Sequence, residues 1–318
     1  MYAKKLAKNG TIGIFCPSHV ADMDRYKVII ETAERLGFAV KLGANFTKDT
    51  YGYAAGAEER ADDLNKLVAD DGVGLILFSG GSSAVEILPY IDYENIKRNP
   101  KLFGSYSDGT SILNAVYTQT GLVTYYGFGA SQFHDLRHYD YTQFCTHFVE
   151  GYGSGHVIEG YGEDNSQFNK KESGVLRFES FSNWKTLRGG VCEGTLIGGY
   201  SGLFGLMLSN KYFSYNNSKK YLLFVEDHKM FSNVGAVSTF LAFIGQSAFM
   251  ENVTGLIFGH YDDIAPDDLL RCLERFGSTH GIPAIYTDDF GHGTKHAIFP
   301  IGINASMDAD NHELVFKY

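Results

Sequence analysis

The first half of the sequence alternates short strand-like runs with segments of helical periodicity, and this alternation constrains the fold more than any other feature. The central run, Val73–Phe78, is apolar and bounded by glycines, which is typical of a parallel strand buried on both faces. Two further runs, Thr11–Phe15 and Ala39–Leu42, are followed by helical patterns over Tyr26–Leu36 and Glu58–Ala69. The order predicts an α/β domain with an open, mostly parallel sheet, whose ligands bind beyond the carboxyl ends of the strands.

The pattern changes after residue 150. Residues 151–173 are rich in glycine and polar side chains, which predicts a linker after a first domain over residues 1–150. Short strand-like runs then alternate with helical segments, so we expect a second α/β domain with a mixed sheet over residues 174–318.

Composition excludes several classes of function. A net charge of −10 argues against a nucleic-acid partner and against adsorption to an anionic membrane surface. No apolar stretch reaches the ~20 residues of a membrane span, and a cytoplasmic protein is the simplest interpretation. The four cysteines are widely separated and show no metal-binding spacing, so we expect reduced, buried thiols and neither a metal nor a cofactor.

The segment Phe103–Thr110 places a serine where chemistry is favoured. Apolar residues precede it and a helical pattern follows it, which predicts a strand–turn–helix corner at Ser107. Such a corner exposes the hydroxyl and directs the first N–H groups of the helix toward it, an arrangement that suits a nucleophile. The motif is not G-x-S-x-G, and local sequence leaves open that Ser107 or Asp108 merely caps the helix.

A nucleophilic serine needs a base and an acid that orients it. Glu226 follows the apolar run Tyr221–Val225, and an acid there can be held rigidly at a sheet edge, although a solvated loop carboxylate is the alternative. His292 lies between two glycines after the strand-like run Ala284–Tyr286, where a tight loop can approach another domain or simply expose the histidine. Other histidines that local sequence leaves as possible bases are His228, His260 and His296.

The turn Ser79–Ser83 ends the central strand and opens a helix. Its backbone N–H groups can bind an anion or line an oxyanion hole. It lacks the P-loop lysine, so a nucleotide-phosphate site is weakly supported, and a plain tight turn is the alternative.

Seven motifs occur in the order known from one family. They are Thr11–Ile14 with Pro17-Ser18, Arg60–Asn65 (R-A-x-D-L-N), Leu88–Tyr93 (L-P-Y-L-D-Y, with Ile91 in the fourth place), Tyr106–Thr110 (Y-S-D-x-T), Gly194–Gly199 (G-x-L-x-G-G), Leu223–Asp227 (L-F-x-E-D) and Gly291–Gly293 (G-H-G). Through them the chain resembles the LD-carboxypeptidase family of serine peptidases, which includes the microcin C self-immunity peptidases.

The resemblance implies roles for single residues. Ser107 would be the nucleophile, His292 the base and Glu226 the acid that orients it, with an oxyanion hole formed by the backbone N–H groups of Gly81 and Asp108. It also implies a flavodoxin-like N-terminal domain, a C-terminal swivelling-type domain, an active site between them and a homodimer.

Some residues depart from the family pattern. Ser79-Gly80-Gly81-Ser82 stands where many members have R-G-G-Y, which resembles the microcin-immunity branch and makes Ser82 a candidate for substrate binding. That branch uses a tryptophan loop to stack on a nucleobase, and Trp184, in the loop Ser182–Lys185, is the only tryptophan; an apolar anchor is the alternative. Two further departures are Ser105 for Gly and Tyr200 for Asn.

The sequence thus predicts a serine amide hydrolase that works through an acyl-enzyme without a metal. Its substrate would be an L,D-peptide bond of a murein tetrapeptide, or alternatively the amide of a peptidyl- or aminoacyl-nucleotide. A small-ligand binding protein on the same fold is the non-enzymatic alternative.

Overall fold

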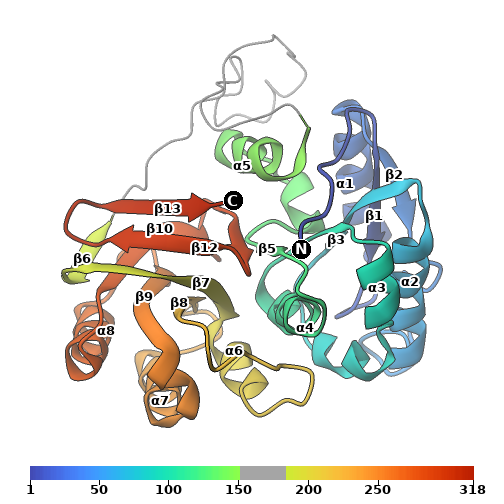
Figure 1. Ribbon diagram of the computed structural model, residues 1–318. Helices are drawn as coiled ribbons and strands as arrows, with labels where there is room; N and C mark the ends of the chain where they lie inside the picture. Colours follow the sequence, from blue (N-terminus) through green and yellow to red (C-terminus); the bar gives the residue numbers. More distant parts are fainter. Residues whose placement is uncertain (151–183) are drawn as a thin grey trace. The chain divides into compact units, whose positions relative to one another are not determined.

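The computed structural model describes residues 1–150 and 184–318 (Figure 1). The chain divides into two compact units, Met1–Glu179 and Ser180–Tyr318, and each is considered by itself. The predicted linker, residues 151–173, lies outside the described residues. In the part of the chain that the structure describes, no helix is both long and apolar enough to cross a membrane.

The first unit contains a parallel sheet with the strand order β5-β4-β3-β1-β2. This is the predicted doubly wound arrangement, and the strands predicted at β1, β2 and β3 are confirmed to the residue. The strand bounds are β1 (Thr11–Phe15), β2 (Ala39–Leu42), β3 (Val73–Phe78), β4 (Leu102–Ser105) and β5 (Thr124–Tyr126).

Helices connect these strands in the usual right-handed sense. The chain first moves outward from β1 to β2 and then returns past β1 to β3, β4 and β5, so right-handed crossovers place α1 on one face and α2, α3 and α4 on the other. The reversal between β1 and β3 is the point where such sheets bind ligands. The helical segments are α1 (Met23–Arg35), α2 (Ala57–Ala69), η1 (Ala84–Tyr90), α3 (Tyr93–Arg98), η2 (Ser107–Gly109), α4 (Thr110–Thr120), η3 (Ala130–Phe133) and α5 (His138–Phe148).

The second unit contains the predicted mixed sheet, with the order β13-β12-β7-β8-β9-β10-β6. Neighbours from β7 to β10 are parallel, and the outer pairs are antiparallel. Its elements are β6 (Lys185–Arg188), β7 (Val191–Tyr200), α6 (Ser201–Met207), β8 (Tyr221–Glu226), α7 (Val234–Gln246), η5 (Ala248–Asn252), β9 (Val253–His260), α8 (Asp267–His280), β10 (Ala284–Gly291), β11 (Phe299–Ile301), β12 (Asn304–Asp308) and β13 (Glu313–Lys317).

One strand is longer than its apolar pattern indicates. The run Ala284–Tyr286 predicts three residues, whereas β10 continues to Gly291. Thr287 and Asp289 are polar, yet both are fully buried in the strand. The extension places His292 directly after a rigid strand instead of in a longer loop.

Candidate active site

Ser107 lies at a sharp corner between β4 and α4. The predicted strand–turn–helix is present, with Ser107 as the first residue of the short helix η2. Its φ is +56°, in the left-handed region that a residue with a side chain enters only at a cost of ~1–3 kcal/mol. The Ser107 N–H donates to Tyr126 Oη (3.0 Å), and Thr110 Oγ1 donates to the Ser107 carbonyl (2.7 Å), so this strained backbone is held from both sides.

Neither Ser107 nor Asp108 caps α4, which was the alternative from local sequence. The residue at the N-cap of α4 is Gly109, which has no side chain that could cap the helix. The Asp108 carboxylate instead accepts hydrogen bonds from Ser18 Oγ (2.6 Å) and from the N–H of Ala84 (2.8 Å). Asp108 therefore ties the serine corner to the loop after β1 and to the start of η1.

The turn Ser79–Ser83 packs against the serine corner. A Cβ atom at Gly80 would lie 2.7 Å from the Ser107 Cβ, so only glycine permits this approach. Gly81 has a φ of +152°, and a Cβ there would lie 2.7 Å from the Ser18 Cβ. Ser82 is exposed at the same turn. The candidate oxyanion loop and Ser107 are thus neighbours within one unit.

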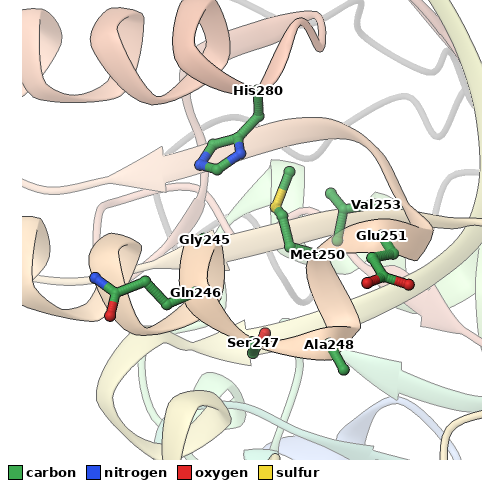
Figure 2. A pocket seen from close by; sticks show the side chains of 8 residues that line it. All are labelled: Gly245, Gln246, Ser247, Ala248, Met250, Glu251, Val253 and His280. Atoms are coloured by element: carbon green, nitrogen blue, oxygen red, sulfur yellow. The ribbon is translucent and has the colours of Figure 1, made fainter.

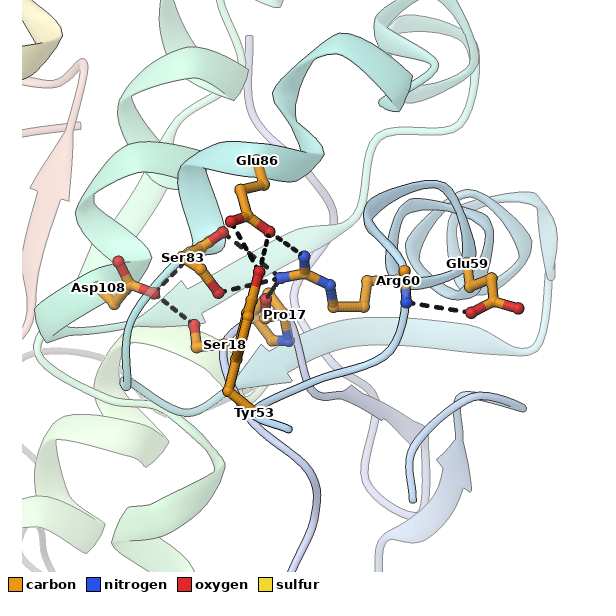
Figure 3. Close-up of polar contacts among 10 residues, drawn as sticks. Pro17, Ser18, Tyr53, Glu59, Arg60, Ser83, Glu86 and Asp108 are labelled. Atoms are coloured by element: carbon orange, nitrogen blue, oxygen red, sulfur yellow. Dashed lines mark hydrogen bonds and ion pairs between the residues drawn. The ribbon is translucent and has the colours of Figure 1, made fainter. Parts of the chain in front are cut away.

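A buried arginine anchors this turn through hydrogen bonds, as Figure 3 shows. Arg60 projects from α2, is 1% exposed, and donates to the Pro17 carbonyl, to Ser83 and to the Glu86 carboxylate. Tyr53 Oη also donates to Glu86 (2.9 Å). The arginine therefore connects the loops that follow β1 and β3.

Burial raises the pKa of Asp108, against the opposing effects of the Ser18 and Ala84 hydrogen bonds and of the Arg60 charge.

The sequence alone did not assign any role to Arg60, Tyr53 or Glu86. The only sequence feature that pointed to Arg60 was the motif that contains it, and the hydrogen-bond partners of Arg60 lie on other elements.

Ser105 replaces the glycine usual in the family without disturbing the corner. Its Oγ donates to the Phe78 carbonyl (2.8 Å), which satisfies the buried hydroxyl. A Cβ at Gly109 would lie 2.2 Å from the same oxygen, so this serine requires glycine four positions later.

In the second unit, Glu226 and His292 form a buried pair. The carboxylate Oε2 lies 2.8 Å from His292 Nδ1, and the two residues are the last of β8 and the first after β10. Glu226 is fully buried. Gly291 has a φ of +105°, and a Cβ there would lie 3.0 Å from the Glu226 Cβ, so the predicted glycine beside the histidine is needed for this approach.

The pair changes the acidity of the imidazole. Burial lowers the pKa of His292, but the charge and hydrogen bond of Glu226, together with the charge of Asp227, outweigh it, and the net pKa is raised. A neutral imidazole whose Nδ1–H faces a carboxylate has its Nε2 available to accept a proton, which is the arrangement of a general base.

Tyr200, the second departure from the family pattern, supports the same pair. Its ring meets the His292 ring edge-on, with centroids 5.6 Å apart, and its Oη donates to Asp227 Oδ1 (2.9 Å). Two competing histidines lie near this pair: the His228 ring stacks on His260 and has its centroid 6.1 Å from that of His292, and His260 Nδ1 lies 3.2 Å from Asp288.

Trp184 is the first residue of the second unit that the structure describes. It is 9% exposed, and its ring stacks on His312 with centroids 5.5 Å apart. This contact fits the anchor interpretation. Ser182 and Asn183, from the predicted tryptophan loop, lie outside the described residues.

A separate open pocket of about 660 Å³ lies between η5 and the ends of α7 and α8, and Figure 2 shows its lining. His280 and Glu251 are its titratable residues. It contains none of the predicted site residues.

The fold and these two sets of residues, one in each unit, define a class of two-domain α/β proteins. One α/β domain has a serine at a strained strand–turn–helix corner, and a mixed α/β domain has a buried carboxylate–imidazole pair. The comparison with known proteins makes the assignment more specific. Residues 12–127 match the LD-carboxypeptidase N-terminal domain, and residues 193–307 match the LD-carboxypeptidase C-terminal domain.

Relatives match over almost the whole chain. YocD of Bacillus subtilis, which bears the name of a carboxypeptidase, is 31% identical over 97% of this chain and 96% of its own length. A second Bacillus subtilis protein, named for murein peptide carboxypeptidase activity, is 27% identical over 96% of this chain and 91% of its own. The microcin C7 self-immunity protein MccF of Escherichia coli is 26% identical over 98% and 94%. The chain belongs to the LD-carboxypeptidase family.

Solved structures agree with this family. An MccF-like protein from Bacillus anthracis has a TM-score of 0.82 at 25% identity. The match covers 99% of this chain and 98% of that protein. MccF in complex with aspartyl sulfamoyl adenosine shares the fold, with a TM-score of 0.80 at 23% identity over 100% of this chain and 98% of its own.

Proposed function

We propose that this chain is a serine carboxypeptidase in which Ser107 is the nucleophile, His292 the general base and Glu226 the acid that orients it. The observation that carries the proposal is the buried Glu226–His292 pair, with 2.8 Å between Oε2 and Nδ1. Membership in the LD-carboxypeptidase family supports the same chemistry. That Ser107 and His292 meet across the two domains is part of the proposal.

The reaction begins when His292 Nε2 takes the Ser107 proton and Oγ attacks the amide carbonyl. Negative charge develops on the carbonyl oxygen, where the N–H groups of Gly81 and Asp108 stabilise it. His292 then returns the proton to the leaving amine, and Glu226 stabilises the imidazolium that exists between the two transfers. Water repeats the sequence on the acyl-enzyme. The Asp108 side chain is held by Ser18 and Ala84, so its role here is confined to its backbone.

The substrate we propose is the L,D-peptide bond of a murein tetrapeptide, which would release the terminal D-residue. A relative named for murein peptide carboxypeptidase activity supports this choice. We propose that Ser82, which is exposed at the candidate oxyanion turn, contacts such a substrate. The homodimer that the family resemblance implies remains a prediction.

A second candidate substrate is the amide of a peptidyl- or aminoacyl-nucleotide. The similarity to MccF, which binds aspartyl sulfamoyl adenosine in a solved structure, favours it. Stacking of Trp184 on a nucleobase would further require that its ring leave the contact with His312. Trp184→Ala should then reduce hydrolysis of the nucleotide amide and leave that of a tetrapeptide unchanged. An equal effect on both substrates would contradict nucleobase stacking.

The experiment that tests the proposed function offers both substrates to the wild type and to Ser107→Ala. We expect D-residue release by the wild type and none above background by the variant. Ser209→Ala, which removes an exposed hydroxyl in the second unit, is the matched control and should keep full activity. Binding of either substrate without turnover would favour a small-ligand binding protein instead.

A further inference from the structure

Two large apolar side chains are exposed in the loop that contacts His292. Met230 and Phe231, in the loop between β8 and α7, are 75% and 62% exposed. The Phe231 ring meets the His292 ring at 66°, with centroids 5.4 Å apart. A single exposed apolar residue needs no explanation, but an adjacent pair does when one of its members contacts a candidate base.

The loop holds this pair in place. The N–H of Met230 donates to His228 Nδ1 (3.1 Å), and the N–H of Phe231 donates to the His228 carbonyl (2.9 Å). At the start of the loop the N–H of Lys229 donates to the Tyr261 carbonyl (3.1 Å), and at its end Asn233 caps α7. These bonds fix the backbone on both sides of the pair, so the side chains form an apolar rim in a defined position.

We propose that Met230 and Phe231 select the residue that leaves, and that they favour a large apolar or aromatic side chain over alanine. The inference rests on the proposed function, because it takes His292 as the group that protonates the leaving amine. A group that receives its proton from His292 lies next to that imidazole, and Phe231 is in contact with the same ring. The side chain of the leaving residue would then pack on the rim and lose its contact with water.

A series of tetrapeptides that differ only in the last residue tests the inference. We expect kcat/KM to be about tenfold higher for D-Phe or D-Leu than for D-Ala, because a surface rim buries part of a large side chain. Phe231→Ala should bring the ratio of kcat/KM for D-Phe to kcat/KM for D-Ala close to one, whereas Phe231→Leu should retain part of the D-Phe advantage.

Phe243→Ala is the matched control, since Phe243 is 70% exposed on α7 and should not alter the ratio. Equal kcat/KM for D-Phe and D-Ala in the wild type would overturn the inference and leave the proposed function intact. So would a Phe231→Ala variant that changes the molecular mass in solution and not the ratio, because the rim would then be a contact between copies of the chain.

Failure of the proposed function has a different signature. If no tetrapeptide is cleaved and a fluorophosphonate does not react with Ser107, the proposed function fails. If no tetrapeptide is cleaved while Ser107 still reacts, the rim does not select leaving peptide residues and the inference is overturned by itself.

Discussion

The left-handed backbone at Ser107 allows a prediction about stability that does not depend on the substrate. Ser107→Ala and Ser107→Gly both remove the hydroxyl, but only glycine relieves the steric conflict at a φ of +56°. The relief is ~1–2 kcal/mol, and the greater freedom of glycine in the unfolded chain opposes it by ~0.4–1 kcal/mol. We therefore expect Ser107→Gly to have the higher free energy of unfolding, by about 1 kcal/mol.

Urea unfolding followed by circular dichroism measures this difference. Ser111 provides the control, because it lies in the regular helix α4 of the same unit. There the sign should reverse, with the glycine variant less stable than the alanine variant by about 1 kcal/mol. If alanine equals or exceeds glycine in stability at position 107, the corner is not strained and the reasoning is refuted.

Two further predictions concern the groups behind the corner and the base. Glu226→Gln should lower kcat by about 10³-fold, because the imidazolium loses its counter-charge. It should also move the rise of kcat/KM to lower pH: Glu226 holds the pKa of His292 above its ordinary value, and the base works only when neutral. An unshifted pH profile would contradict this. For Arg60→Met we expect about 2–3 kcal/mol of lost stability, since the Pro17 carbonyl loses its donor and Glu86 its partner. Lys66→Met, on the exposed face of the same helix, should change the free energy of unfolding by less than about 0.5 kcal/mol in the same urea titration, and an equally small effect at Arg60 would contradict the role given to it.

The parts of the fold that the sequence predicted are those set by local periodicity. Val73–Phe78 is a buried central strand because its apolar run leaves no polar face, and the observed strand has the same bounds. Glu226 was expected at a strand end, and it is the last residue of β8. The strand at Ala284 was predicted too short, because buried polar side chains such as Asp289 interrupt the apolar pattern without ending the strand.

Contacts between distant segments were beyond the reach of periodicity. Arg60 stands in a helix with several charged residues, and nothing local distinguishes the one that reaches the Pro17 carbonyl and Glu86. Asp108 looks like a helix cap from its position, yet its carboxylate bonds to Ser18 and to the start of η1. Both side chains act through partners that only the folded chain brings near.

The most direct test of the central claim is covalent labelling with a fluorophosphonate, followed by mass spectrometry of the modified peptide. A serine activated by an imidazole reacts with this probe, whereas an ordinary surface serine does not. The account predicts one adduct, located on Ser107 and lost in both Ser107→Ala and His292→Ala. An adduct that persists in Ser107→Ala, or labelling of Ser107 that is unchanged in His292→Ala, would contradict the proposed triad.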